Sequence, residues 1–241
     1  MIIGGLEKLT LLDYPDHLAA IIFTSGCNFR CRYCYNPMLV LPRKGEDVKN
    51  KEDLSSIASE DLFLFLKERF GRLEGVVITG GEPTLHPDLP EFIKEIKKIG
   101  YLVKLDTNGT NPEMLEKLIK DKTIDYIAMD IKADVENYEK VVGVRVDFKK
   151  LEKSVKLIMK SGLPYEFRTT LVPGLIDKKT FLVMGELIKG AKKWYLQNFK
   201  SDTNLVDQSL KGQKPFSSKE MKEFAALGRK FTEICEDRSG E

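Results

Sequence analysis

The chain of 241 residues lacks a strong net charge, a long apolar run and a secretion signal. Its 39 Lys and Arg are nearly balanced by 37 Asp and Glu, and because nucleic-acid-binding proteins usually carry a basic stripe, we expect no nucleic-acid partner. The longest apolar runs, such as residues 19–23, are far too short to span a membrane. The N-terminus also lacks the basic start and apolar core of a secretion signal. We therefore expect a cytoplasmic protein without membrane contact.

Cysteine is scarce as well, and its placement is uneven. Three of the four cysteines, Cys27, Cys31 and Cys34, lie in the segment GCNFRCRYCYNP at residues 26–37. Disulfides are rare in a reducing compartment, so clustered cysteines there are more often metal ligands or redox groups. The spacing Cys-x3-Cys-x2-Cys is therefore the first functional signal in the sequence.

Alternating strand and helix patterns run through most of the chain. Short apolar or β-branched runs predict strands at residues 19–24, 75–79, 101–107, 124–130, 165–171 and 193–199. Helix-spaced Leu and Ile predict helices at residues 60–70, 88–99, 112–120, 147–162, 178–190 and 218–236. This alternation is typical of βα units around a parallel sheet. No linker divides the chain, so we expect one α/β domain over residues 1–241, with a core at about 15–200 and a C-terminal helix at about 217–236.

Polar residues gather where the predicted strands end. Six βα units are too few for a closed eight-stranded barrel, so we predict an incomplete (β/α)6 barrel of the TIM type with a parallel sheet. Ligands bind at the carboxyl ends of the strands in such folds. The residues found there are Thr24, Gly80, Gly81, Glu82, Asp106, Thr107, Asn108, Asp130, Lys132, Arg168 and Gln197. Their distribution over separate strand ends predicts a single functional site at one rim.

Three interpretations of the cysteine segment compete. A zinc site requires four protein ligands, or three and an open position, and Cys235, which lies on the predicted terminal helix, is a poor fourth ligand. A thioredoxin-like pair of Cys31 and Cys34 would leave Cys27 without a role. A [4Fe–4S] cluster held by three thiolates accounts for all three cysteines and leaves one iron open to a ligand.

The motifs carry a family resemblance. From Asp13 to about Phe199 the chain resembles the radical S-adenosylmethionine (SAM) enzymes, whose signature is CxxxCxφC with an aromatic residue at φ, here Tyr33. The Gly80-Gly81-Glu82 sequence resembles the family motif that binds the amino group of SAM. The stretch LTLLDYPDHLAAIIFTSGCNFRCRYCYNP resembles the activating proteins of anaerobic ribonucleoside-triphosphate reductases and is similar to pyruvate formate-lyase activases. Asn36 matches the C-x-N-P marker of this glycyl-radical-enzyme-activating branch, whereas Tyr35 replaces the histidine that the resemblance leads us to expect.

The resemblance implies roles for the residues of the predicted rim. The implied ligands of the [4Fe–4S] cluster are Cys27, Cys31 and Cys34. The implied SAM-binding residues are Tyr33, Gly80, Gly81, Glu82, Asp106, Asn108, Asp130, Lys132 and Arg168. The implied ligands of a monovalent cation beside SAM are Asp106, Thr107 and Asp130. In this scheme Lys132 faces the carboxylate of SAM.

Simpler interpretations of several of these residues stay open. The sequence from Asp106 to Gly109 is also a plain turn signal. Asp130 and Lys132 are equally compatible with a simple ion pair. Arg168 lies within a strand that is predicted to be buried, and a buried arginine needs an anionic partner, which is either a ligand or an acid of the core.

The resemblance also implies a function. In this branch SAM is cleaved by one electron, for which we expect flavodoxin or ferredoxin as donor, and a 5′-deoxyadenosyl radical removes hydrogen from a glycine of a partner. We expect that partner to be a glycyl radical enzyme, with anaerobic (class III) ribonucleotide reductase ahead of pyruvate formate-lyase. Two rival classes are a radical SAM enzyme acting on a small molecule, as in the queuosine pathway, and a non-catalytic metal-binding module. The cysteine-free stretch from Tyr35 to Thr79 excludes activases with a ferredoxin-like insert after the first cluster.

Overall fold

The computed structural model describes residues 1–40 and 57–239, so part of the cysteine-free stretch lies outside the described residues. The chain divides into two compact units. The first contains residues 1–28, 38–107 and 113–127, and the second contains residues 29–37, 108–112 and those from 128 onward. One boundary falls inside the cysteine segment, and another falls inside a strand. A single domain over residues 1–241 stays a prediction.

Within the described residues, the strands form one eight-stranded sheet whose order follows the chain from β1 to β8. The strands are β1 (Ile3–Thr10), β2 (Ala19–Thr24), β3 (Gly75–Gly80), β4 (Leu102–Thr107), β5 (Tyr126–Asp130), β6 (Tyr165–Leu171), β7 (Ala191–Asn198) and β8 (Thr232–Asp237). The helices are α1 (Pro37–Val40), α2 (Ser59–Arg69), α3 (Leu89–Ile99), α4 (Pro112–Lys120), α5 (Tyr138–Val142), α6 (Phe148–Lys160), α7 (Lys178–Leu187) and α8 (Ser218–Gly228), with short 3-10 helices η1 (Pro83–Leu85) and η2 (Gln208–Leu210). The six predicted strands correspond to β2 through β7.

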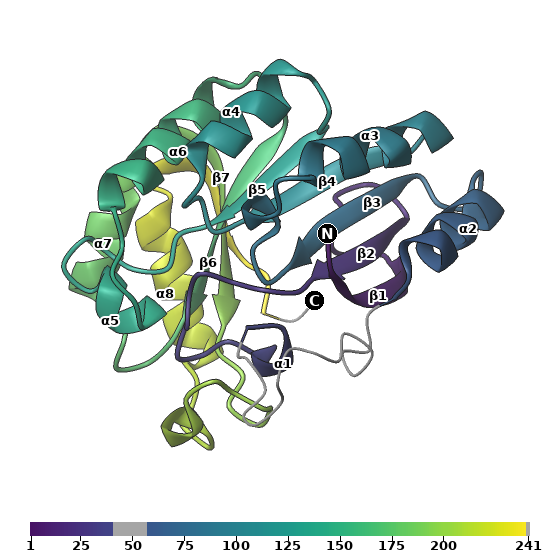
Figure 1. Ribbon diagram of the computed structural model, residues 1–241. Helices are drawn as coiled ribbons and strands as arrows, with labels where there is room; N and C mark the ends of the chain where they lie inside the picture. The colour runs from purple at the N-terminus through teal and green to yellow at the C-terminus, as the bar shows by residue number, and fades with distance from the viewer. Residues whose placement is uncertain (41–56, 240–241) are drawn as a thin grey trace. The chain divides into compact units, whose positions relative to one another are not determined.

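Parallel pairing in the first unit brings two predicted strand ends together. β2 pairs with β3 and β3 with β4 in parallel, while β1 pairs antiparallel with β2. The register places Thr24 of β2 opposite Gly80 of β3. Both strands are buried along most of their length, as expected for a parallel sheet that is covered by helices. Helices α2 and α3 pack against each other on the outside of these strands (Figure 1).

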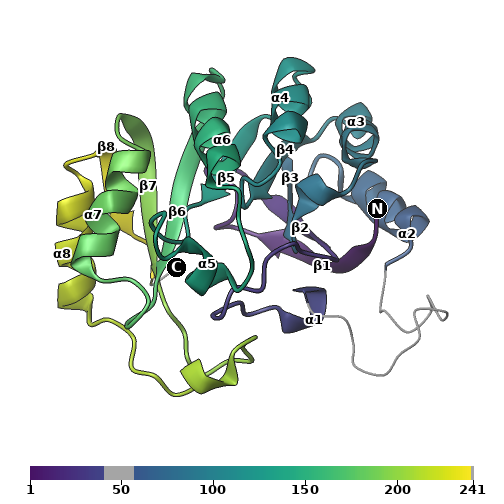
Figure 2. The same cartoon turned by 60° about the vertical axis from the view of Figure 1, so that its left-hand side comes forward.

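An aromatic layer fastens the helices of the second unit to its strands. β6, β7 and β8 pair in parallel, and α7 and α8 lie beside them (Figure 2). Trp194 of β7 is fully buried and stacks on Phe181 of α7, with 4.4 Å between ring centroids. Phe224 of α8 meets the Phe181 ring edge-on at 5.1 Å. Each of these rings contributes a large apolar area, so the layer holds both helices against the sheet.

Side-chain caps fix where several helices begin. The Asp147 carboxylate accepts a hydrogen bond from a backbone N–H in the first turn of α6, and the Asp177 carboxylate does the same in α7. Ser217 and Glu220 form a reciprocal capping box at the start of α8. These bonds satisfy backbone donors that have no partner inside a helix.

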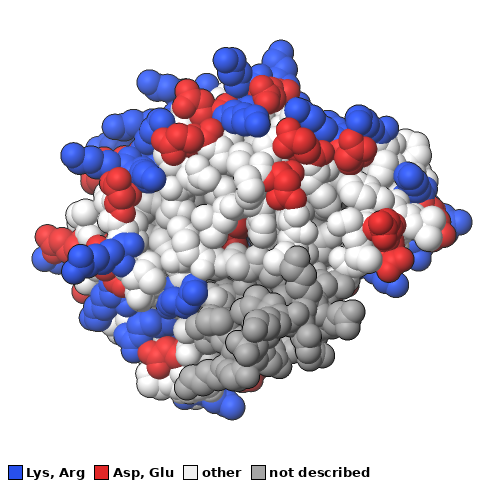
Figure 3. Space-filling view, in the orientation of Figure 1, with Lys and Arg blue, Asp and Glu red and all other residues white. Residues whose placement is uncertain are grey.

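Charge on the surface is mixed in sign. Figure 3 shows Lys and Arg interspersed with Asp and Glu over helices α3 and α4. None of the helices in the described part of the chain combines the length and the apolar character that crossing a membrane requires.

The predicted C-terminal helix at 217–236 is wrong in its second half. Helix α8 ends at Gly228, and Thr232–Asp237 form strand β8 parallel to β7. Within β8 only Thr232 and Cys235 are buried, and these residues are three positions apart, which is a helical spacing. Backbone pairing with β7 therefore outweighs the local pattern, and Cys235 is a strand residue. Strand β1 was also absent from the prediction.

The contact between α8 and β8 can be tested by a double-mutant cycle. A Cβ atom at Gly228 would lie 2.3 Å from the Sγ of Cys235. We expect Gly228→Ala to lower the free energy of unfolding by about 1–3 kcal/mol, because the helix must move away from the strand. We expect Cys235→Ala to recover part of that loss in the double variant, as measured by urea unfolding. Strictly additive losses would contradict the contact.

Candidate functional site at the strand ends

Two strand-end turns of the first unit lie against each other. After β3, the backbone N–H of Gly81 donates to the Thr24 carbonyl and that of Glu82 donates to the Gly26 carbonyl, both at 2.8 Å. A Cβ atom at Gly81 would lie 2.0 Å from the Gly26 carbonyl oxygen, so a residue larger than glycine does not fit. The turn formed by Gly80, Gly81 and Glu82 (the GGE turn) is therefore held against the turn that leads into Cys27. The structure thus gives Gly81 a backbone-packing role, while its role toward SAM stays a prediction.

The Glu82 carboxylate joins the ends of β3 and β4. Its side chain is buried, with 1% of the residue exposed. The Oε1 atom accepts hydrogen bonds from the Thr84 backbone N–H at 3.1 Å, the Thr84 hydroxyl at 2.5 Å and the Thr107 hydroxyl at 2.7 Å. Hydrogen bonds to an ionised acceptor are among the stronger ones, so this oxygen is well fixed. Glu82 and Thr107, predicted at the same rim, are in direct contact.

A buried lysine next to Asp106 was missed by the sequence analysis. Lys104 of β4 is 1% exposed, and its Nζ atom lies 3.0 Å from Oδ1 of Asp106. The same Nζ donates to the Asp13 carbonyl at 2.6 Å, and it lies 5.8 Å from the centroid of the Tyr126 ring. Burial of an ammonium group is tolerated only with such partners. Asp106, predicted as a cation ligand, thus has a lysine of the chain as counter-ion.

In the second unit, Asn108 forms the turn that its sequence also indicated. Its Oδ1 atom accepts from the backbone N–H of Thr110 at 3.0 Å and from the Thr110 hydroxyl at 2.7 Å. Gly109 follows with a φ of 78°, and its carbonyl accepts from the Ser154 hydroxyl at 2.7 Å. The amide oxygen of Asn108 therefore serves the turn, which is the simpler of the two interpretations.

Asp130, at the end of β5, lies between two cations of the second unit. Its Oδ1 atom accepts from Nε of Arg168 at 3.0 Å, and its Oδ2 atom accepts from Nζ of Lys132 at 3.3 Å. Burial opposes ionisation of this carboxyl, but the charges of Arg168 and Lys132 outweigh it and hold the pKa of Asp130 at about 2. Burial likewise opposes the charge of Lys132, but Asp130 outweighs that effect and raises the Lys132 pKa. Asp130 thus forms the simple ion pair with Lys132 and is also the acidic partner that the buried Arg168 requires.

Two buried tyrosines lie close to these charges. The Nζ atom of Lys132 lies 6.0 Å from the centroid of the Tyr33 ring, a cation–π arrangement. Burial raises the pKa of Tyr33, and the charge of Lys132 offsets only part of this, so the hydroxyl is neutral at physiological pH. Tyr138 of α5, which the sequence analysis did not single out, is also buried and packs edge-on against Phe29 and Phe148.

The three clustered cysteines are free thiols. Cys31 is buried, whereas Cys27 and Cys34 are partly exposed. Cys31 and Cys34 close a turn in which the Cys34 backbone N–H donates to the Cys31 carbonyl at 3.0 Å. Three thiols on one short segment are a donor set suited to a [4Fe–4S] cluster with one open iron. Within the described residues no three His, Cys, Asp or Glu side chains are gathered so as to hold a metal ion, so joint ligation by these thiols stays a prediction.

Three further residues take different places. Cys235 is fully buried next to Gly228 and Trp194, and burial raises the pKa of its thiol to about 12, so it is a core residue of the second unit. Gln197 is exposed on β7, and Asn36 is half-buried. Neither shows a contact that assigns it a role.

Comparison with known proteins identifies the family. Residues 21–182 match the model of the Radical SAM superfamily. The chain belongs to the radical SAM superfamily. A protein of Methanocaldococcus jannaschii named as a glycyl-radical enzyme activating enzyme is 32% identical over 235 residues, which cover 95% of this chain and 92% of that protein. The pyruvate formate-lyase-activating enzyme of Streptococcus mutans is 29% identical over 201 residues, which cover 79% of this chain and 73% of the relative. Within the superfamily, this radical SAM protein belongs with the activating enzymes.

A solved structure supports the fold assignment. A domain of a pyruvate-formate lyase-activating enzyme from Bacteroides vulgatus superposes with a TM-score of 0.55 at 18% identity, covering 70% of this chain and 99% of that one. Together with the strand order, this likeness confirms the predicted fold class, an incomplete α/β barrel of the TIM type. Membership of the family also confirms the predicted cofactors, a [4Fe–4S] cluster and SAM. A monovalent cation stays a prediction.

The close approach at Gly81 predicts a strong effect of one methyl group. We expect Gly81→Ala to lower the free energy of unfolding by about 1–3 kcal/mol, because its Cβ meets a backbone oxygen that cannot move aside cheaply. Gly5→Ala is a matched control, since the nearest atom to a Cβ at Gly5 lies 3.5 Å away. Thermal unfolding of both variants provides the comparison. Equal stability of the two variants would contradict the packing role of Gly81.

The ion pairs of Asp130 predict a defined pH dependence. The Asp130 pKa of about 2 lies below the value of about 3.9 in an unfolded chain. The stabilisation is therefore complete above about pH 4 and disappears as the pH falls through about 2. We expect Asp130→Asn to cost about 1–3 kcal/mol of unfolding free energy at pH 7, because the side chain is partly exposed and the full cost of breaking a buried pair does not apply. Urea unfolding from pH 7 to pH 2 should show the difference shrinking. A constant difference would contradict the assignment.

Proposed function

We propose that this radical SAM protein activates a glycyl radical enzyme, and that its target is an anaerobic ribonucleotide reductase. The main support is the turn that leads into Cys27, which is bonded to the GGE turn after β3, in a chain that matches a relative named for this activation over nearly its whole length. The resemblance of residues 9–37 to the reductase-activating proteins favours this target.

The bound cluster and SAM supply a 5′-deoxyadenosyl radical and methionine when a flavodoxin or ferredoxin delivers one electron. In this proposal Cys27, Cys31 and Cys34 would hold the cluster through three thiolates, which would leave one iron for SAM. In this proposal the GGE turn receives the amino group of the methionine moiety, and Lys132 and Arg168 receive its carboxylate. Asp130 keeps both cations charged and oriented before SAM arrives.

Hydrogen abstraction completes the proposed reaction. With the cluster and SAM bound, the 5′-deoxyadenosyl radical that they supply would remove one hydrogen atom from the Cα of a glycine in the partner enzyme. The products are 5′-deoxyadenosine and a glycyl radical, so each activation consumes one electron and one SAM. The buried Tyr33 and Tyr138 keep neutral hydroxyls beside this chemistry, because burial raises both pKa values.

Pyruvate formate-lyase is the second candidate target. It is supported by the 29% identity with the activating enzyme of Streptococcus mutans. A purified target of each class therefore belongs in the same experiment.

Two cysteine-to-alanine variants of this chain test the cluster assignment. We expect anaerobically reconstituted protein with a reductant to convert SAM to 5′-deoxyadenosine, and Cys31→Ala to abolish this, as measured by liquid chromatography. Cys235→Ala, which removes a thiol from the core instead, should retain the activity. Cleavage that persists in Cys31→Ala, or a colourless protein that binds zinc, would contradict the proposal.

Electron paramagnetic resonance tests the partner. We expect a glycyl radical doublet when the protein, SAM and a reductant are mixed with an anaerobic ribonucleotide reductase, and a weaker signal or none with pyruvate formate-lyase. A doublet with the lyase alone would reassign the target. If 5′-deoxyadenosine forms but no anaerobic reductase or lyase of the host gains a radical, the result favours a small-molecule substrate.

A further inference from the structure

The cysteine segment is held on one side by the chain between β7 and α8. This β7–α8 segment comprises residues 199–217 and belongs to the same unit as residues 29–37. The backbone N–H of Val206 donates to the Cys34 carbonyl at 3.2 Å, and that of Asp207 donates to the Arg32 carbonyl at 2.9 Å. The Arg32 side chain returns the contact, with its Nε atom 2.7 Å from Oδ2 of Asp207.

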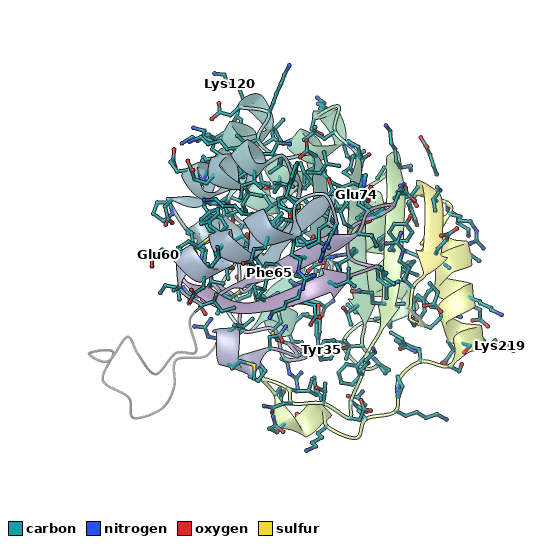
Figure 4. The ribbon with its side chains drawn as sticks, turned by 90° about the vertical axis from the view of Figure 1, so that its right-hand side faces the viewer. Tyr35, Glu60, Phe65, Glu74, Lys120 and Lys219 are labelled. Atoms are coloured by element: carbon teal, nitrogen blue, oxygen red, sulfur yellow. The ribbon has the colours of Figure 1, made fainter. Side chains whose placement is uncertain are left out.

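Tyr35 provides a second tie to the same segment. Its hydroxyl oxygen accepts from the backbone N–H of Lys200 at 2.9 Å. Figure 4 shows Tyr35 next to the yellow-green chain that follows β7. The tyrosine that replaces the expected histidine thus extends to the β7–α8 segment and bonds to its backbone.

Helix α5 holds the cysteine segment on the other side. The backbone N–H groups of Arg30 and Arg32 donate to the carbonyls of Val142 and Val141, at 2.7 and 3.2 Å. Gly143 ends this helix at a φ of 72°, and a Cβ there would lie 2.8 Å from the Arg30 carbonyl oxygen. Arg32, between the second and third cysteines, therefore has its backbone N–H and its carbonyl bonded to different elements.

A second contact, independent of Arg32, orients the Asp207 carboxylate. Its carboxylate caps η2 by accepting from the Ser209 backbone N–H at 2.9 Å. The hydrogen bonds from Ser209 and the guanidinium of Arg32 hold the Asp207 pKa at about 2, so the carboxylate is ionised at physiological pH. An exposed ion pair contributes little to global stability. This pair, however, acts on Arg32, whose backbone N–H and carbonyl are both hydrogen-bonded.

We propose that Asp207 is a positioning residue for the cluster, acting through Arg32 on the turn that carries Cys31 and Cys34, with Tyr35 as a second tie. The inference rests on the proposed function in one respect, that these cysteines hold the cluster. A site with only three thiolates has no spare protein ligand when one of them moves away. Hydrogen bonds and ion pairs that restrict the turn are therefore expected to slow the release of iron. They also fix the orientation of the thiolates, on which the electron paramagnetic resonance spectrum of the bound cluster depends.

A matched ion pair in the same unit provides the control. Lys178 and Glu223 are also 2.7 Å apart, but they are more exposed and they join α7 to α8. Asp207→Ala and Glu223→Ala thus remove equivalent charges, and only the first lies at the cysteine segment. Tyr35→Phe removes the second tie with little change in size.

The first measurement uses the metal-free protein. We expect backbone amides of residues 29–35 to exchange hydrogen about fivefold faster in Asp207→Ala, the factor that corresponds to loss of one surface ion pair, with no change in Glu223→Ala. A smaller acceleration is expected in Tyr35→Phe. Arg32→Ala combined with Asp207→Ala should be no faster than Asp207→Ala alone, because the ion pair is already lost in that variant.

The second measurement uses the reconstituted protein. We expect Asp207→Ala to release iron to a chelator faster than the wild type and to shift the electron paramagnetic resonance spectrum of the reduced, SAM-bound cluster. The exchanged pair Arg32→Asp with Asp207→Arg should restore both properties in part. Asp207→Ala that matches Glu223→Ala in amide exchange, iron release and spectrum would overturn the inference while leaving the proposed function intact. A wild type that binds no cluster would overturn both.

Discussion

The hydrogen bond from the Glu82 backbone N–H to the Gly26 carbonyl sets the geometry of the polar strand ends in the first unit. It forms because Gly81 has no side chain to separate the two turns, which approach until a Cβ would collide with an oxygen. Once the GGE turn is fixed in this way, the Glu82 carboxylate reaches the Thr107 hydroxyl and links the end of β3 to that of β4. The ends of three successive strands therefore depend on one close backbone contact. This contact sets the distances between the polar side chains at these ends.

The second unit reaches order by a different physical route, through charge. Asp130 compensates Arg168 and Lys132 inside the protein, so the two cations are already aligned and ionised. Preorganised charges of this kind avoid the reorganisation that flexible groups in water would require. The aromatic rings of Tyr33 and Tyr138 add a rigid, weakly polar surrounding that strengthens these interactions. Backbone packing in one unit and ion pairing in the other thus each hold polar groups in place.

The sequence predicted the parts of this protein that depend on local pattern. Strands β2 to β7 and most helices follow from runs and spacings of apolar residues, and the clustered cysteines and glycines identify the family by their order. Contacts between residues far apart in the chain left no such signal. Lys104 is a charged residue in a predicted strand, and nothing nearby reveals that the Asp13 carbonyl receives its ammonium. Arg32 and Asp207 are 175 positions apart. The residues of β8 have a helical spacing of buried positions, and only their pairing with β7 makes them a strand. Pairing over such distances depends on the folded chain.

The antiparallel direction of β1 brings its start to the end of β2. Since β1 runs against β2, its first residue, Ile3, pairs with Thr24 at the end of β2. The Ile2 carbonyl accepts from the Ser25 backbone N–H at 3.0 Å, and the terminal ammonium of Met1 bonds to Asp88. The first residues of β1 therefore support the turn that leads into Cys27. A change at Ile2 or Ile3 that weakens this pairing would reach that turn through the backbone, although neither residue carries a polar group of the candidate site.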